Sequence, residues 1–154
     1  SRDFVKDISA AAPALGLTVS AAKVSSNQTL YNALQTVLVS PSVLLAVPDP
    51  KVFNNFTIPN VLLTAYRHPS PVIGFSPAYV RAGAVMAVYS SPEQMGQQAA
   101  EMAVQSLLGN PLPEARHPAY FSVSVNPHVA RSLSIDLPDA ATLEAQIRRQ
   151  EGAR

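Results

Sequence analysis

The segment Gly74-Phe75-Ser76-Pro77-Ala78 holds the serine whose surroundings come nearest to those of a catalytic nucleophile. In the hydrolase pattern G-x-S-x-G, the serine sits between a strand and a helix, and the next backbone N–H stabilises the oxyanion. The residue after this serine is a proline, which has no N–H to donate. The three histidines of the chain show no spacing that links one of them to this serine and an acid. The sequence therefore favours a structural turn over a serine hydrolase, and we expect no catalytic residue.

Neither a metal nor a bound cofactor is indicated by the residue pattern. The three histidines lack the spacing of metal ligands, and the chain has no cysteine. Its six glycines are not grouped into a loop that could cradle phosphate. We therefore expect no metal site and no cofactor.

Asp49, Tyr79 and Arg81 are the polar residues best placed to contact a ligand. Asp49 closes an apolar run between two prolines. A turn aspartate fits that position, and so does a ligand contact at the carboxyl end of a parallel strand. Tyr79 and Arg81 follow the break at Ser76 and Pro77, where a binding loop and an ordinary surface are equally good interpretations.

Apolar runs of strand length stand directly before these candidate residues. Residues 43–47 and 71–75 contain almost only apolar side chains, which is typical of parallel strands covered on both faces. Helices are expected between the strands, so that the two kinds of element alternate. We expect strands at 17–24, 43–48, 71–75, 84–89 and 119–125. The alternation predicts an α/β fold in three layers, with a parallel sheet and helices on both of its faces.

Capping residues mark several helix ends. Ser91 is followed by a proline, and Gln94 comes three residues later, which gives the clearest helix start of the chain. Ser25 and Gln28 have the same spacing, and Gly16 stands where a first helix would end.

Composition excludes several classes of protein. With 154 residues, 47% of them hydrophobic, the chain can bury a core, so a disordered protein is excluded. Its 11 basic and 10 acidic residues form no basic stripe, so we expect no nucleic-acid partner. No apolar run reaches the roughly 18 residues that a membrane span needs. The first residues also lack the pattern of a signal peptide.

A series of short segments, taken in order and with their spacing, resembles one protein family. The segments are Val47–Pro50, Pro71–Ser76, Val80–Ala84, Met95–Ala103, Leu108–Pro111 and Val125–Leu133. Together they resemble the substrate-binding proteins of ABC transporters, in the branch with a type I periplasmic-binding fold whose members include aromatic amino-acid binders. The resemblance covers nearly the whole chain.

The resemblance implies one lobe of a two-lobed protein whose ligand lies in a cleft between the lobes. Residues 1–90 are similar to the second lobe, which binds ligand, and residues 91–154 to the segment that returns toward the first lobe. The first lobe is absent from this sequence. So is the strand that would precede Ser1, which the family's sheet order makes central.

In this family the second lobe contacts ligand through loops at the carboxyl ends of its strands. The corresponding loops here are Ser25–Asn27, Asp49–Asn54, Ser76–Arg81 and Tyr89–Ser91. Asp49, Ser76 and Tyr79 match the better-placed positions and are our ligand-binding residues. Tyr79 could stack on a flat apolar ligand, and Ser76 could donate to a carboxylate.

The function that the resemblance implies is solute binding for an ABC importer, in the periplasm or another extracytoplasmic compartment. The expected partners are a small molecule, for example an aromatic or apolar amino acid, and a membrane permease. A ligand-sensing module of a regulator or receptor is the alternative, because the same fold serves that task. An enzyme is the third class of function considered for this chain.

Self-association is the last expectation, and it concerns the helix from Pro92 to Leu108. Its apolar face consists of Met95, Ala99, Met102, Ala103 and Leu107. Burying each larger side chain of this face contributes about 1.5–3 kcal/mol, and the lobe that would cover them is missing. We therefore expect a homodimer or a segment-swapped dimer, formed through this helix, through the strand at 119–125, or through both.

Overall fold

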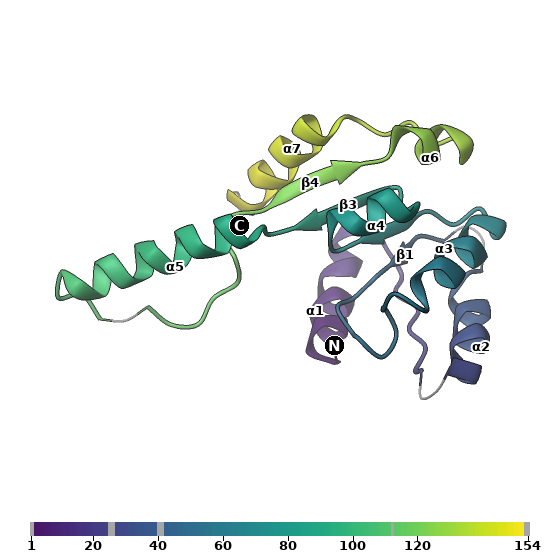
Figure 1. Cartoon of the computed structure of the whole chain (residues 1–154), viewed down its shortest axis with the longest axis horizontal. Coiled ribbons are helices and arrows are strands. Elements are labelled where there is room, and N and C mark those ends of the chain that lie inside the picture. Colours follow the sequence, from purple (N-terminus) through teal and green to yellow (C-terminus); the bar gives the residue numbers. More distant parts are fainter. Residues whose placement is uncertain (1, 25–26, 40–41, 112, 153–154) are drawn as a thin grey trace. The chain divides into compact units, whose positions relative to one another are not determined.

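The computed structural model describes residues 2–24, 27–39, 42–111 and 113–152 of the chain, and their helices and strands alternate (Figure 1). The first half contains helix α1 (Arg2–Ala11), the 3₁₀ helix η1 (Ala12–Leu15), α2 (Asn27–Val37), β1 (Leu44–Leu45), α3 (Ile58–Arg67), β2 (Val72–Gly74) and α4 (Pro77–Ala82). The second half contains β3 (Met86–Tyr89), α5 (Pro92–Leu107), β4 (Ser122–Val125), α6 (Pro127–Ser132) and α7 (Ala140–Gly152).

The four strands form one sheet in the order β1-β2-β3-β4. Strand β2 pairs in parallel with both of its neighbours, with Leu44 opposite Val72 and Ile73 opposite Met86. Each parallel pair is joined through a helix, as the alternation of elements requires. The predicted α/β fold with parallel strands is therefore confirmed.

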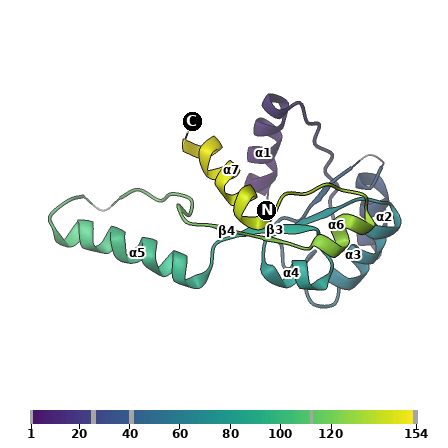
Figure 2. The same ribbon diagram turned by 90° about the horizontal axis from the view of Figure 1, so that it is seen from above.

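The described residues form two compact units, Ser1–Ala87 with Val125–Leu137, and Val88–Ser124 with Pro138–Arg154. Unit 1, the first of these, contains a buried cluster formed by Leu30, Leu34, Leu38, Ala46, Val61, Leu62, Ala65, Val72, Tyr79 and Ala84. The buried residues of α2 and α3 recur at helical spacing, so each helix has one buried face. Within this unit, Figure 2 shows α1 and α4 on opposite sides of strand β3.

The strand expected at 17–24 does not form, and this prediction is wrong. Residues 17–24 have no regular structure, and Leu17 and Val19 are exposed. An alternating sequence becomes a strand only when a neighbouring strand satisfies its backbone N–H and C=O groups. Among the described residues, no strand pairs with residues 17–24.

The expected strand at 43–48 is reduced to Leu44 and Leu45, at one edge of the sheet. The apolar run was expected to be covered on both faces, yet Val43 is 58% and Leu45 43% exposed. An edge strand has one hydrogen-bonded neighbour instead of two, so fewer residues are held in the ladder. This shortening and the missing strand at 17–24 thus have the same physical origin.

The first helix ends where the sequence predicts. Gly16 adopts a left-handed conformation with φ 68°, which L-residues disfavour, and its backbone N–H closes the last turn. Pro13 stands in the 3₁₀ turn at the end of the α-helix, because its ring and missing N–H interrupt α-helical bonding. The apolar side chains of α1 and η1 are only partly covered, since Phe4 of α1 and Leu15 of η1 are exposed.

The capping box predicted at Ser91 is confirmed. The Ser91 hydroxyl accepts a hydrogen bond from the Gln94 backbone N–H at 3.2 Å, and the Gln94 side-chain oxygen accepts from the Ser91 N–H at 2.8 Å. The similar box expected at Ser25 lies outside the described residues.

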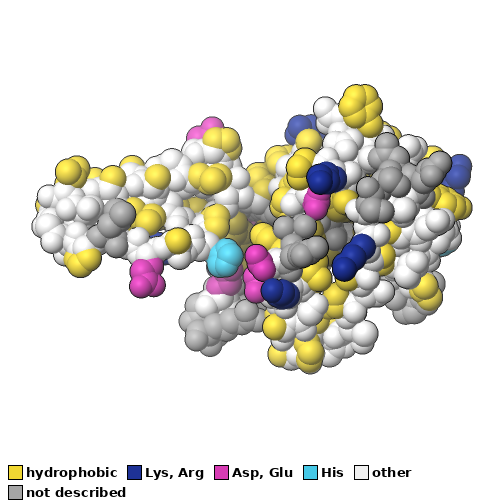
Figure 3. All heavy atoms as spheres, turned by 90° about the horizontal axis from the view of Figure 1, so that it is seen from below, with side chains coloured by type: hydrophobic (Ala, Val, Ile, Leu, Met, Phe, Trp, Pro, Cys, Tyr) yellow, Lys and Arg dark blue, Asp and Glu magenta, His cyan; other side chains and the backbone are white. Residues whose placement is uncertain are grey.

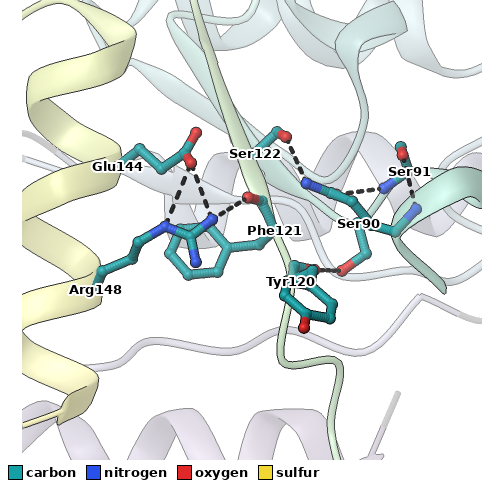
Figure 4. Close-up of polar contacts among 8 residues, drawn as sticks. Ser90, Ser91, Tyr120, Phe121, Ser122, Glu144 and Arg148 are labelled. Carbon is teal, nitrogen blue, oxygen red and sulfur yellow. Dashed lines mark hydrogen bonds and ion pairs between the residues drawn. The ribbon is translucent and has the colours of Figure 1, made fainter. Parts of the chain in front are cut away.

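In unit 2, polar contacts join the start of α5 and helix α7 to residues 120–122 (Figure 4). The Gln94 amide donates to the Ser122 hydroxyl at 2.9 Å, and the Ser90 hydroxyl donates to the Tyr120 carbonyl at 2.7 Å. On α7, the Arg148 guanidinium donates to the Phe121 carbonyl at 3.1 Å and lies 4.6 Å from the centroid of the Phe121 ring. The same guanidinium forms an ion pair with Glu144 of α7 at 2.9 Å, which orients it toward Phe121, the residue just before β4.

Helix α5 presents most of its apolar side chains to solvent. Met95 is exposed and Leu107 is 87% exposed, while the one buried residue of this helix is polar Gln98. Figure 3 shows hydrophobic side chains at the surface of the segment that contains α5. Met95, a member of the apolar face expected on this helix, is therefore uncovered in this chain.

Strand β2 provides the first prediction, because Gly74 lies against Tyr79 of α4. A Cβ atom added at Gly74 would come within 2.5 Å of the Tyr79 Cβ atom, which belongs to the rigid part of that side chain. We expect Gly74→Ala to lower the free energy of unfolding by about 1–3 kcal/mol, the usual cost of overpacking. Urea denaturation measures this change.

Gly96 is the matched control for that substitution. It lies in the middle of α5, and an added Cβ would meet no atom within 4 Å. Gly96→Ala should therefore raise the free energy of unfolding by roughly 0.5–1 kcal/mol, because alanine is the better helix former. Equal effects of the two substitutions would contradict the contact between Gly74 and Tyr79.

Candidate functional site

The candidate site lies in unit 1, at the edge of the sheet where the parallel strands β1 and β2 end. Both strands run in the same direction, so the loop after β1 and the turn after β2 leave the sheet on the same side. Asp49 lies in the first of these connections. Ser76 follows β2, and Tyr79 lies in α4 directly after it.

Asp49 organises the turn that follows β1. Its side-chain oxygen Oδ1 accepts a hydrogen bond from the Lys51 backbone N–H at 3.0 Å. Its carbonyl oxygen accepts from the N–H groups of Val52 at 3.0 Å and Phe53 at 2.7 Å. Asp49 therefore acts as a turn aspartate. Contact between this half-buried residue and a ligand stays a prediction.

Thr57 and Asn54 brace the rest of this loop. The hydroxyl of buried Thr57 donates to the Val52 carbonyl at 2.7 Å and accepts from the Asn54 N–H at 3.0 Å. The Asn54 side chain accepts from the Phe56 N–H at 3.0 Å and donates to the Pro50 carbonyl at 3.0 Å. These bonds fix the backbone on either side of Phe53.

Ser76 occupies the N-cap position of the short helix α4. Its backbone is extended, with φ −157° and ψ 158°, and its carbonyl accepts the Tyr79 N–H at 3.1 Å. The hydroxyl makes no capping bond to α4, and the residue is half-buried. Pro77 begins the helix, so the backbone N–H that an oxyanion would need is missing directly after the serine.

Tyr79 is 5% exposed and belongs to the buried cluster of unit 1. Its ring centroid lies 4.7 Å from that of Phe75 and 6.2 Å from that of Phe53. Its hydroxyl is buried and has no hydrogen-bond partner among the described residues. Burial raises the pKa of Tyr79 above its ordinary value, so the phenol stays protonated and keeps its donor at neutral pH.

Phe53, Phe75 and Tyr79 form an aromatic group that we call the edge cluster. The rings of Phe53 and Phe75 lie edge to face, with centroids 6.3 Å apart, and both residues are half-buried. Phe53 also donates its N–H to the Asp49 carbonyl, so the edge cluster connects the Asp49 turn with α4.

Phe53 and Phe75 are not among the ligand-binding residues predicted from the sequence. The signal available was their position, because each follows an apolar strand within a few residues. The expected contact loop Tyr89–Ser91 belongs to unit 2, and Ser25 and Ser26 lie outside the described residues. The described site is therefore made of the connections after β1 and β2.

The described ranges contain neither a cluster of metal ligands nor a helix able to span a membrane. Within these ranges, no group of three or more His, Asp or Glu residues could hold a metal ion. None of the helices in the described part of the chain has the length and apolar character that a bilayer span requires.

Solved structures share this fold at low sequence identity. A conserved domain protein from Vibrio cholerae matches with a TM-score of 0.66 and 22% identity, over 92% of this chain and 48% of its own. An ABC domain from Streptococcus pneumoniae, in complex with L-Trp, matches with a TM-score of 0.65 and 22% identity, over 89% of this chain and 48% of its own. A substrate-binding protein with adhesive properties from Clostridium difficile, in a ligand-free, open structure, matches with a TM-score of 0.64 and 21% identity. The match covers 88% of this chain and 45% of its own. The chain thus spans about half the length of these proteins.

The family model for ABC transporter substrate-binding proteins matches residues 1–148, which is nearly the whole chain. A comparison with curated proteins gives no match. The resemblance carried by the short segments is therefore confirmed over the same region, together with the periplasmic-binding type of fold. This chain belongs to the family of ABC transporter substrate-binding proteins.

Proposed function

We propose that this chain supplies the ligand-binding lobe of a solute-binding protein that serves an ABC importer outside the cytoplasm. Residues 1–90 contribute the ligand contacts, and residues 91–154 form the segment that returns toward a first lobe. A membrane permease receives the ligand. The observation that supports this most is the edge cluster, because it gathers partly exposed aromatic rings at the strand ends where open α/β sheets bind ligands.

The ligand of this proposal is a small aromatic or apolar amino acid. Half-buried Phe53 and Phe75 offer an apolar surface to its side chain. Lys51 and Arg81 stand in the connections after β1 and β2, and their positive charges suit the carboxylate of the ligand. Ser76 donates to that carboxylate, and Asp49 attracts the ammonium group. The complex of the Streptococcus pneumoniae domain with L-Trp supports this class of ligand.

The proposal includes no catalysis. Ser76 is followed by Pro77, so an acyl transfer at this serine would lack its adjacent oxyanion donor. Family membership points the same way, because the family is defined by substrate binding.

Ser76→Ala tests the proposed carboxylate contact. We expect the full-length protein to be stabilised by one or more of the twenty amino acids in a thermal-shift screen. For that amino acid, Ser76→Ala should raise the Kd about tenfold or more, because a hydrogen bond to a charged group contributes about 1.5–3 kcal/mol. Isothermal titration calorimetry measures the Kd.

Ser132→Ala serves as the control, because its hydroxyl bonds only the local carbonyl of Val129 on exposed α6. An unchanged Kd in Ser76→Ala would disprove the site assignment. Esterase activity that disappears with Ser76→Ala would overturn the class of function as well.

We also propose that the chain, expressed by itself, associates with a second copy through α5. The exposed apolar side chains of this helix, Met95, Val104 and Leu107 among them, support this proposal. An apolar stripe that no lobe covers is commonly buried against a partner.

Leu107→Glu tests this association. The side chain is 87% exposed, so the substitution should leave the fold intact while it places a charge in the interface. We expect sedimentation at micromolar concentration to give a dimer for the original chain and a monomer for Leu107→Glu. Gln105→Glu is the control, because a carboxylate can still accept the bond from Asn110. A monomeric original chain would refute the dimer.

A further inference from the structure

Strand β4 stands at the end of the described sheet, beside β3. The Tyr120 carbonyl accepts a hydrogen bond at 2.7 Å from the hydroxyl of Ser90, which directly follows β3. At the other end of β4, the Asn126 N–H donates to the Val85 carbonyl at 2.9 Å. Backbone groups of an extended chain point alternately to its two sides, so the even-numbered residues face β3. The carbonyl of Phe121 therefore points to the outer edge of β4.

The segment Tyr120–Val125 has the composition of a strand that pairs readily with other chains. Aromatic and valine side chains alternate with serine, and the segment contains no charged residue, no glycine and no proline. Such segments form sheets between molecules when their edge is free. Pro118 and Pro127 stand on either side of it, where prolines commonly limit this pairing. The outer edge of β4 thus needs a cover.

Helix α7 provides that cover. Figure 1 shows it on the side of β4 opposite to β3, and Phe121 and Val123 are each only 7% exposed. The Arg148 guanidinium donates to the outward carbonyl of Phe121 at 3.1 Å and lies 4.6 Å from the centroid of its ring (Figure 4). Glu144 accepts two bonds from the same guanidinium, at 2.9 and 3.3 Å. One oriented side chain therefore occupies the start of the outer edge.

Apart from this contact, α7 is only loosely held. Among its residues 140–151 none is buried, and its apolar side chains Leu143 and Ile147 are half-buried. An element with few buried apolar contacts opens at a much lower free energy than the core of a protein. Arg148 is consequently the residue on which the closed position of α7 depends most.

We propose that α7 is a displaceable strap held by Arg148, and that its release opens the outer edge of β4 for antiparallel pairing with β4 of a second copy. A second copy suits this edge, because two identical edges related by a two-fold axis complement each other. The segment also carries no charge that would repel its own kind. The contact through residues 119–125 that the sequence predicts is thus blocked while the strap is closed.

The test uses the chain with Leu107→Glu, so that association through α5 does not contribute. In this background Arg148→Ala removes the bond to Phe121 and keeps a good helix former. Arg149→Ala is the matched control, because it removes the same charge from the same turn. Arg149 is exposed and makes no hydrogen bond or ion pair with the described residues.

Hydrogen exchange read by mass spectrometry and sedimentation at micromolar concentration give the result. We expect the amides of α7 to exchange at least tenfold faster in Arg148→Ala than in Arg149→Ala, because the strap opens more often. Arg148→Ala should sediment as a dimer and Arg149→Ala as a monomer. In the dimer, residues 120–125 should gain protection while α5 does not. Unchanged exchange in α3 shows that the fold of unit 1 is retained.

Glu144→Gln is a milder second variant, because it weakens the ion pair and leaves the bond to the Phe121 carbonyl in place. It should accelerate exchange in α7 by a smaller factor. A monomeric Arg148→Ala chain, or equal exchange of α7 in the two alanine variants, would overturn the proposal. A dimer without added protection at 120–125 would overturn it as well. Such a failure leaves the proposed ligand site and the association through α5 untouched, since neither includes Arg148.

Discussion

Main-chain pairing along β2 is the interaction on which the arrangement of this chain depends. The strand bonds to β1 on one side and to β3 on the other, and both pairs are parallel. Parallel pairing makes neighbouring strands end at the same edge, so it brings the turn of Asp49 and the turn of Ser76 to one side of the sheet. The same pairing explains the weak elements, because β1 has no further strand beside it among the described residues and shortens to two residues.

Close packing of α4 on β2 is the second constraint, and it shapes the candidate site. Gly74 has no side chain, which allows the Tyr79 ring to rest on the strand and to meet Phe53 and Phe75. The packing buries the Tyr79 hydroxyl without a partner in the described chain, at a cost of about 1–3 kcal/mol. Core packing and polar satisfaction therefore conflict at this residue, and such conflicts are expected where a protein binds something.

Unit 2 is stabilised in a different way. Local signals define its helix α5, since the capping box at Ser91 and the following proline need no distant partner. Polar contacts join Gln94 of α5 to Ser122 of β4 and Arg148 of α7 to Phe121, the residue before that strand. Much of the apolar surface of α5 stays exposed, which agrees with a chain that spans about half the length of the solved structures it resembles.

Sequence patterns alone determined the elements whose causes are local, together with the family. The end of the first helix at Gly16, the helix start at Ser91, the apolar strand β2 and the buried face of α3 all follow from residues close together in the chain. Placement of Asp49 and Ser76 after strands followed from the same reasoning. Tertiary structure alone decided which apolar segments become strands, because residues 17–24 alternate as a strand should and yet have no neighbour to pair with. It also decided that Tyr79 is buried against Phe53 and Phe75, because ring contacts depend on how distant loops meet in space.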